Sequence, residues 1–301
     1  MISLRKITRT NEDSRASLCT PRLLTALRPL LISRYAVVQT NAVAALVNLS
    51  LEKVNKVKIL RSGVVPALID VLKCGLGDSP EHAAGALFSL ALEDDNKTAI
   101  GVLGALEPLL HALRSESERT RHDSSLALYH LSLIQGNRVK LVKLGAVSTL
   151  LAMLRSGGDL AAKVLLVICN LAACTEGRSA MLDCNAVECL VEILRVGKEL
   201  GTESTRENCV AALYALSHGS MRFKGLAREA RAVEVLREVV ETGTERAREK
   251  AKRILAMLRG RDEEDEDDEE EVDWEEVLEG GQSRTRLRVG RNLYGANSTE
   301  F

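Results

Sequence analysis

The chain has 301 residues and a formal net charge of −1; 46% of its residues are apolar but only 3% are aromatic. A core made mainly of Leu, Val, Ile and Ala is typical of closely packed helices and predicts an all-α protein. No stretch approaches the roughly 20 apolar residues that cross a bilayer, and the first residues lack the apolar run of a signal peptide. We therefore expect a soluble protein of the cytoplasm and/or nucleus, without membrane insertion.

The first apolar helical face in chain order is followed by a matching face 41 residues later. The two sets are Leu24, Leu27, Leu30, Leu31 and Val65, Leu68, Val71, Leu72. In this register, residues 1 to about 10 correspond to the end of a helix that would begin further upstream. We therefore expect the first repeat to be truncated.

Five similar segments predict a helix that recurs once in every repeat. They are NAVAALVNLSLE from Asn41, HAAGALFSLALE from His82, DSSLALYHLSLI from Asp123, KVLLVICNLAAC from Lys163 and NCVAALYALSHG from Asn208. Their starting positions advance by 41, 41, 40 and 45 residues, and a period near 40 is that of armadillo and HEAT arrays. In the first two segments Ala and Leu recur at the spacing of one helical face, at Ala42, Ala45, Leu46, Leu49 and at Ala83, Ala86, Leu87, Leu90. Stacked repeats would share one continuous core.

The residues between these segments predict a short helix, a turn and a second helix. The turn is marked by Gly63, Gly104 and Gly145, where a residue with positive φ is expected, and Asn185 takes the position in the fourth repeat. Each repeat thus has three helices, of which the recurring segment is the third. The predicted fold is an armadillo-type, right-handed α-α superhelix over residues 1–260.

Residues 261–301 are predicted to form a disordered tail, because ten consecutive acidic residues from Asp262 to Glu271 cannot bury apolar surface. Up to Arg261 the chain has 37 Lys or Arg and 27 Asp or Glu, so a basic array precedes an acidic tail. One hypothesis is that the tail folds back onto the array and competes with acidic partners. The alternative is a solvated tail that only aids solubility.

Motifs for chemistry are missing from the sequence. The seven cysteines have no CxxC spacing and no neighbouring His cluster, so we expect reduced, mostly buried thiols and neither metal nor cofactor. The contiguous His122, Asp123 and Ser124 would point in different directions on a helix, which excludes a catalytic triad. No phosphate-binding loop occurs, and the scarcity of aromatic residues argues against nucleic-acid binding.

The recurring motifs resemble the armadillo family over roughly residues 1–260. They are A-x-x-A-L-x-N-L in a third helix, N-[KR] opening the next repeat and G-A-V-x-x-L-L-x-L-L. More narrowly, GALFSLALEDDNKTAIGVLGALEPL is similar to the armadillo region of plant U-box E3 ubiquitin ligases, and SRTRLRVGRNLYGANSTEF is similar to tails of one subgroup. This resemblance implies an arm that selects a protein substrate or a receptor-kinase-like partner.

The U-box itself has no counterpart in this sequence, since no segment resembles its C-P-I opening, its D-P-V or its G-x-T-Y-E-R run. The resemblance therefore implies that ligase activity does not reside in this chain alone. Three classes of function remain: a recognition arm of the ubiquitin pathway, which we favour, a signalling scaffold of an unrelated pathway, and an enzyme. The oligomeric state cannot be inferred.

In armadillo proteins the third helices line a concave groove, where a recurring Asn holds the backbone of an extended peptide. The resemblance places that position at Asn48, Ser89, His130, Asn170 and Ala215, so only two of five match. A mixed polar row lies seven residues earlier, at Asn41, His82, Asp123, Lys163 and Asn208. We expect these rows to bind a partner through its side chains, although any one member could be an ordinary solvated helix residue. The Trp by which importin-like adaptors bind nuclear localisation signals is replaced by Ala44, Gly85, Leu126, Leu166 and Ala211.

Overall fold

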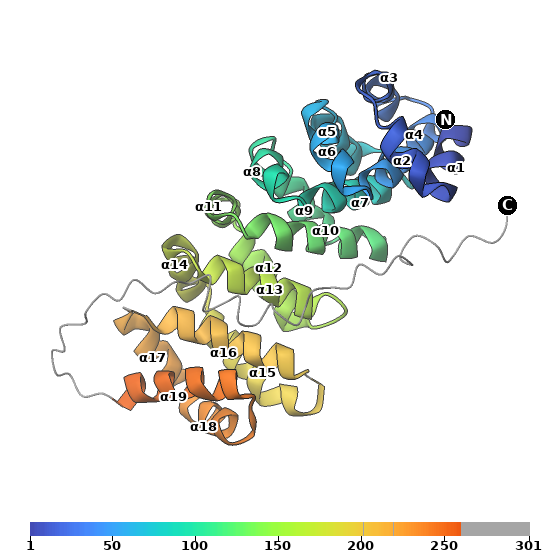
Figure 1. The fold of residues 1–301 in the computed structure, drawn as a ribbon. Coiled ribbons are helices and arrows are strands. Elements are labelled where there is room, and N and C mark those ends of the chain that lie inside the picture. Colours follow the sequence, from blue (N-terminus) through green and yellow to red (C-terminus); the bar gives the residue numbers. More distant parts are fainter. Residues whose placement is uncertain (201, 219, 260–301) are drawn as a thin grey trace. The chain divides into compact units, whose positions relative to one another are not determined.

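The computed structural model describes residues 1–200, 202–218 and 220–259, and nineteen α-helices account for the regular structure in these ranges (Figure 1). No strand occurs in the described ranges, so the prediction of an all-α fold is confirmed. No helix in this part of the chain combines the length and the hydrophobicity that a membrane crossing needs. The predicted tail, residues 261–301, lies outside the described residues.

The helices recur in triplets, as the repeat predicts. The first helices are α2 (Glu12–Leu18), α5 (Lys53–Arg61), α8 (Asp94–Val102), α11 (Gln135–Lys143), α14 (Thr175–Asp183) and α17 (Met221–Glu229). The second helices are α3 (Pro21–Leu31), α6 (Val65–Cys74), α9 (Leu106–Ala112), α12 (Ala146–Ser156), α15 (Ala186–Leu200) and α18 (Ala232–Thr242). The third helices are α1 (Ile2–Thr10), α4 (Ala36–Ser50), α7 (Ser79–Ala91), α10 (Glu118–Ser132), α13 (Ala161–Ala172), α16 (Glu203–Ser217) and α19 (Glu245–Arg259).

The chain divides into two compact units, residues 1–189 and residues from 190 onward. In the first unit each third helix packs against the next, from α1 through α4, α7 and α10 to α13, and the second helices α3, α6 and α9 also pack in sequence. In the second unit α19 packs against both α16 and α18. Small residues allow the third helices to approach closely, because Ala42 and Ala45 lie beside Leu46 and Leu49, all fully buried.

The turn before each second helix has the predicted left-handed backbone. Gly63, Gly104 and Gly145 have φ of 75°, 93° and 73°, and Asn185 has φ of 55°. The fifth repeat places Arg231 at the same position with φ of 54°, which no glycine or asparagine in the sequence marks. The turn geometry is therefore fixed by the packing of the repeat, even where the residue is unfavourable for it.

An asparagine in the first turn of three first helices, α5, α8 and α11, bonds to the preceding helices. Asn55, Asn96 and Asn137 are fully or almost fully buried, and each donates from Nδ2 to a carbonyl in the last turn of the preceding third helix, 3.0–3.1 Å away. Asn55 and Asn137 donate in addition to carbonyls of the preceding first helix, at Arg15 (2.9 Å) and Lys97 (3.1 Å). The asparagine of the N-[KR] motif thus bonds the preceding third helix at all three positions and the preceding first helix at two of them.

The fourth repeat has Gly177 in place of that asparagine. A Cβ on Gly177 would lie 1.9 Å from the carbonyl oxygen of Leu171, so the chain passes too close for any side chain. The neighbouring Arg178 donates instead to the carbonyl of Ala172 (3.2 Å). In this repeat the backbone of the first helix at Gly177 packs directly against the end of the third helix at Leu171.

Five of the seven cysteines are buried, Cys184 is half-buried and Cys74 is exposed, and all seven are free thiols. Burial raises the pKa of Cys19, Cys174 and Cys189 above the ordinary thiol value. The expectation of mostly buried thiols is thereby confirmed. A raised pKa makes these three thiols less reactive, in keeping with a role in packing.

Candidate partner-binding face

The third helices α4, α7, α10 and α13 of the first unit lie side by side (Figure 1). Two polar rows run across them. The first polar row consists of Asn41, His82, Asp123 and Lys163, and the second polar row of Asn48, Ser89, His130 and Asn170. Within each helix the two members are seven residues apart, which is two helical turns and therefore the same face. We call the surface that contains both rows the third-helix face.

The second polar row is bonded to neighbouring helices. Asn48 donates from Nδ2 to the hydroxyl of Thr8 on α1 (3.1 Å) and to the carbonyl of Arg5 (3.3 Å). One repeat later, the Ser89 hydroxyl donates to the carbonyl of Ser50 on α4 (2.9 Å). These donors link each third helix to the one before it.

Asn170 follows the same pattern, since its Nδ2 lies 2.9 Å from the Ser132 hydroxyl on α10. His130 differs, because its ring lies against two aromatic rings, 5.9 Å from Phe88 on α7 and 5.0 Å from Tyr129. Burial, assisted by the charge of Lys97, lowers the pKa of His130 to about 4. The second polar row is thus uncharged at neutral pH and largely committed to internal contacts.

The first polar row is surrounded by charge. Asn41 accepts a hydrogen bond from Arg5 on α1 (3.5 Å) and donates to the carbonyl of Val37 (2.7 Å). His82 is half-buried, and burial together with the charges of Arg5 and Arg119 lowers its pKa to about 4. The imidazole is therefore neutral at neutral pH and feels the charges of both arginines.

Arg119 connects the first polar row to further carboxylates. Its guanidinium lies 3.2 Å from Glu81 on α7 and 3.9 Å from the buried Asp123. Glu81 also accepts from the Ser117 hydroxyl (2.9 Å), and His122 lies 3.3 Å from Asp123. The side chains of Arg119 and Glu81 remain 40% and 26% exposed, so this network can be reached from outside.

The two remaining predicted residues lie apart from this network. Lys163, on α13, is half-buried. Asn208 lies buried on α16, which belongs to the second unit, and is not counted as part of the third-helix face. The structure thus brings eight of the nine predicted residues onto neighbouring helices, and their role in binding stays a prediction.

A series of cationic side chains lies near the C-terminal ends of the third helices. No structural role was predicted for these residues from the sequence. The members of this series follow the N-[KR] position: Arg15, Lys56, Lys97, Arg138 and, half-buried, Arg178. Lys56 shows the arrangement, because its Nζ donates to the carbonyls of Ser50 (2.6 Å) and Ser89 (2.7 Å) and to the Ser89 hydroxyl (2.8 Å). Burial lowers its pKa to about 8, against the opposing charges of Glu93 and Glu52. At Lys56 the basic half of the motif thus binds helix C-terminal carbonyls, where positive charge is favourable, whereas Lys97 pairs with Asp94.

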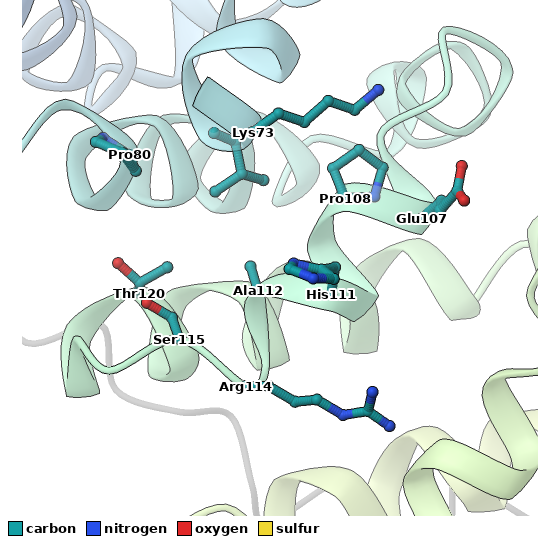
Figure 2. Close-up of a pocket in the computed structure, with 10 residues that line it drawn as sticks. Lys73, Pro80, Glu107, Pro108, His111, Ala112, Arg114, Ser115 and Thr120 are labelled. Carbon is teal, nitrogen blue, oxygen red and sulfur yellow. The ribbon is translucent and has the colours of Figure 1, made fainter. Parts of the chain in front are cut away.

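The third-helix face can make hydrogen bonds and ion pairs. In the described residues no group of three or more His, Cys, Asp or Glu side chains is placed to hold a metal ion. A separate depression of about 510 Å³ is formed by α6, α7, α9 and α10 (Figure 2). Lys73, Glu107, His111 and Arg114 belong to its lining, but none of the nine predicted residues does.

Known proteins similar to this chain are plant U-box proteins. The chain is 62% identical over 312 residues to U-box domain-containing protein 38, 59% over 305 to protein 41 and 60% over 304 to protein 40, all of Arabidopsis thaliana. Each match covers 100% of this chain but only 55–56% of the relative, so the chain spans about half the length of the curated relatives it matches. No family model matches the chain.

Solved structures with a similar fold are armadillo repeat proteins. A designed armadillo repeat protein has a TM-score of 0.68 at 21% identity, covering 78% of this chain and 99% of its own. A second, computationally designed for modular peptide recognition, has a TM-score of 0.70 at 21% identity with the same coverage. A third, in complex with the peptide (KR)4, has a TM-score of 0.67 at 20% identity, covering 78% and 99%. The predicted armadillo fold and the resemblance to plant U-box proteins are both confirmed.

Proposed function

We propose that this armadillo-repeat chain, similar over its whole length to plant U-box proteins, is the partner-recognition arm of a U-box E3 ubiquitin ligase. The observation that carries the proposal is the charged network around the first polar row, where Arg119 joins Glu81 and Asp123 across two repeats. Such a network presents both signs of charge on a rigid surface. The whole-chain similarity supports the link to the ubiquitin pathway.

The proposed partner is a protein, either a substrate or a receptor-kinase-like protein, that lies along the third-helix face. Since Asn48, Ser89 and Asn170 bond neighbouring helices, a regular clamp on the partner's backbone has few available donors. Recognition would then depend on partner side chains that pair with Arg119, Glu81 and Lys163. This differs from a generic peptide clamp and favours a specific partner carrying charges of both signs.

Ligase activity is proposed to require the U-box that the relatives' names record. The chain alone would bind without transferring ubiquitin. We propose that it acts in the cytoplasm and/or nucleus, without membrane insertion or nucleic acid. The second candidate function is that of an armadillo scaffold in an unrelated pathway. Such a scaffold would bind its partners through the same third-helix face.

Variants that remove charge from the first polar row and from the network around it test the binding role. Arg119→Ala with Lys163→Ala should weaken binding of a purified partner at least tenfold, while circular dichroism of the variant stays that of the wild type. The matched control is Lys73→Ala with Arg114→Ala, two cations of the depression in Figure 2. Equal losses in both variants would contradict a specific face.

Ubiquitin transfer separates the two candidates. The chain incubated with activating and conjugating enzymes should show no autoubiquitination, and the same chain fused to a U-box should ubiquitinate its bound partner. A partner that binds the third-helix face but is never modified by the fusion favours the scaffold. Transfer by the chain alone would overturn the proposed division of labour.

A further inference from the structure

The helices α18 and α19 enclose a depression of about 340 Å³ at the C-terminal end of the described chain. All of its lining residues come from these two helices. Arg237, Lys252 and Arg259 carry positive charge there, and Glu241 is the single carboxylate among the lining residues. We call this surface the end face.

Arg237 occupies a position that is apolar in the preceding repeats. It lies six residues after Arg231, the positive-φ residue of its turn. The residues six after the equivalent turn positions are Ile69, Leu110, Leu151 and Val191, all buried. In this repeat an exposed arginine replaces the buried aliphatic residue.

Lys252 and Arg259 show the same replacement on α19. The buried face of α19, formed by Ala251, Ile254, Leu255 and Leu258, aligns with Cys209, Ala212, Leu213 and Leu216 of α16. In this register Lys252 takes the place of Val210 and Arg259 that of Ser217, both of which are buried. Three positions that are buried in other repeats are therefore cationic here.

A polar outer face is expected of a terminal repeat, because no further repeat covers it. That requirement would be met equally well by acidic or neutral residues. Here the three replacements are all cations, and the apolar residues Val240, Leu255 and Ala256 line the same depression. The combination of cationic and apolar lining residues suits an acidic segment that also carries large apolar side chains.

Such a segment follows directly in this chain. Residues 262–279 contain fourteen acidic residues and no Lys or Arg. Their C-terminal part, VDWEEVLE, includes Val272, Val277, Leu278 and Trp274, the only tryptophan of the protein. The sequence thus places opposite charge and matching apolar residues within twenty residues of the end face.

We propose that the acidic segment 262–279 of the same chain docks on the end face, with Trp274 against Val240 and Leu255. Twelve residues separate Arg259 from Val272, and an extended chain of that length reaches at most roughly 40 Å, which is long enough to bring Trp274 to the end face. Because both partners belong to one chain, the effective local concentration is high, so a weak contact suffices for high occupancy. Docking would cover the end of the array without a further repeat.

The fluorescence of Trp274 in the full-length chain tests this directly, since no other tryptophan contributes. At low salt the emission should be blue-shifted and protected from acrylamide relative to free N-acetyltryptophanamide. At about 1 M NaCl, where charges are screened beyond about 3 Å, both effects should diminish. An unshifted, fully quenchable emission at low salt overturns the proposal.

Charge reversal locates the docking site. Arg237→Glu with Arg259→Glu should shift Trp274 emission to that of the free fluorophore. The matched control, Lys224→Glu with Arg228→Glu on α17, makes the same change in net charge and should leave the emission unchanged. If both variants change the emission alike, the contact is not at the end face. If the blue shift grows with protein concentration, the acidic segment binds a second copy of the chain. Either result overturns docking within one chain.

Discussion

The Nδ2 of Asn48 lies 3.1 Å from the hydroxyl oxygen of Thr8, forty residues earlier in the chain and on the neighbouring third helix. Both side chains are buried. A residue whose position in the repeat suggests partner binding therefore also links two repeats. Losses of binding and losses of stability must be separated at this site.

Asn48→Ala should lower the free energy of unfolding by about 1–3 kcal/mol, because the Thr8 hydroxyl and the Arg5 carbonyl lose a buried donor. Urea denaturation followed by circular dichroism measures the change. In a double-mutant cycle, Asn48→Ala and Thr8→Ala should couple by about 0.5–1.5 kcal/mol. Purely additive effects would show that the hydrogen bond does not contribute.

Leu90→Ala should destabilise the fold by about 2–5 kcal/mol, because Leu90 is fully buried on α7 and the truncation leaves a cavity. Leu103→Ala is the control, since Leu103 is 43% exposed. Its effect should stay within about 0.5 kcal/mol. Similar thermal unfolding shifts for both variants would argue against the packed third-helix core.

Two glycine substitutions should change stability in opposite directions. Gly177→Ala brings a Cβ to 1.9 Å from the Leu171 carbonyl oxygen and should cost about 1–3 kcal/mol. Gly136→Ala, on α11, meets nothing within 4 Å and should stabilise the helix by about 0.5–1 kcal/mol. Differential scanning calorimetry distinguishes them, and a stabilised Gly177→Ala would contradict the close backbone approach.

Acidification should destabilise the protein through His82 and His130. Their folded-state pKa values of about 4 lie below the ordinary 6.5, so between these values the unfolded chain binds protons that the folded chain does not. The contribution of the two histidines to the free energy of unfolding is fully present above pH 6.5. It falls as the pH decreases toward 4, by up to about 3 kcal/mol for each histidine.

Replacing both histidines by glutamine isolates this contribution from that of the carboxylates. The unfolding free energy of His82→Gln with His130→Gln should depend less steeply on pH between 6.5 and 4 than that of the wild type. His111→Gln is the control, because His111 is exposed. An unchanged slope in the double variant would show that the two half-buried imidazoles are protonated without a cost in stability.

Periodicity was sufficient to predict the repeat, the three helices of each repeat and four of the left-handed turn positions, since these features depend on spacing within one repeat. It could not predict Arg231 at the fifth turn, because no local preference favours arginine there. The bonds of Asn48 and Ser89 also escaped prediction. They depend on which atom of a helix about forty residues away lies opposite, and this is decided by packing between repeats.

The first polar row illustrates the same limit for the candidate site. Its helical face followed from the seven-residue spacing, but the surrounding Arg5, Glu81 and Arg119 come from positions that no recurring motif marks. The N-[KR] motif was recognised as a family signature. Its basic residue was assigned a structural role only when Lys56 was seen to bind the ends of two third helices.

The side-chain hydrogen bonds between consecutive repeats differ from one junction to the next, because they depend on the residue at the motif asparagine position. At Asn55 and Asn137 a side chain crosses from one repeat to the previous one, so unfolding of one repeat removes a buried partner from its neighbour. Among the described residues Asn96 bonds only to the preceding third helix, and Gly177 has no side chain with which to cross. The repeats that begin with Asn96 and Gly177 are therefore coupled to their neighbours by at least one buried hydrogen bond fewer than those that begin with Asn55 and Asn137.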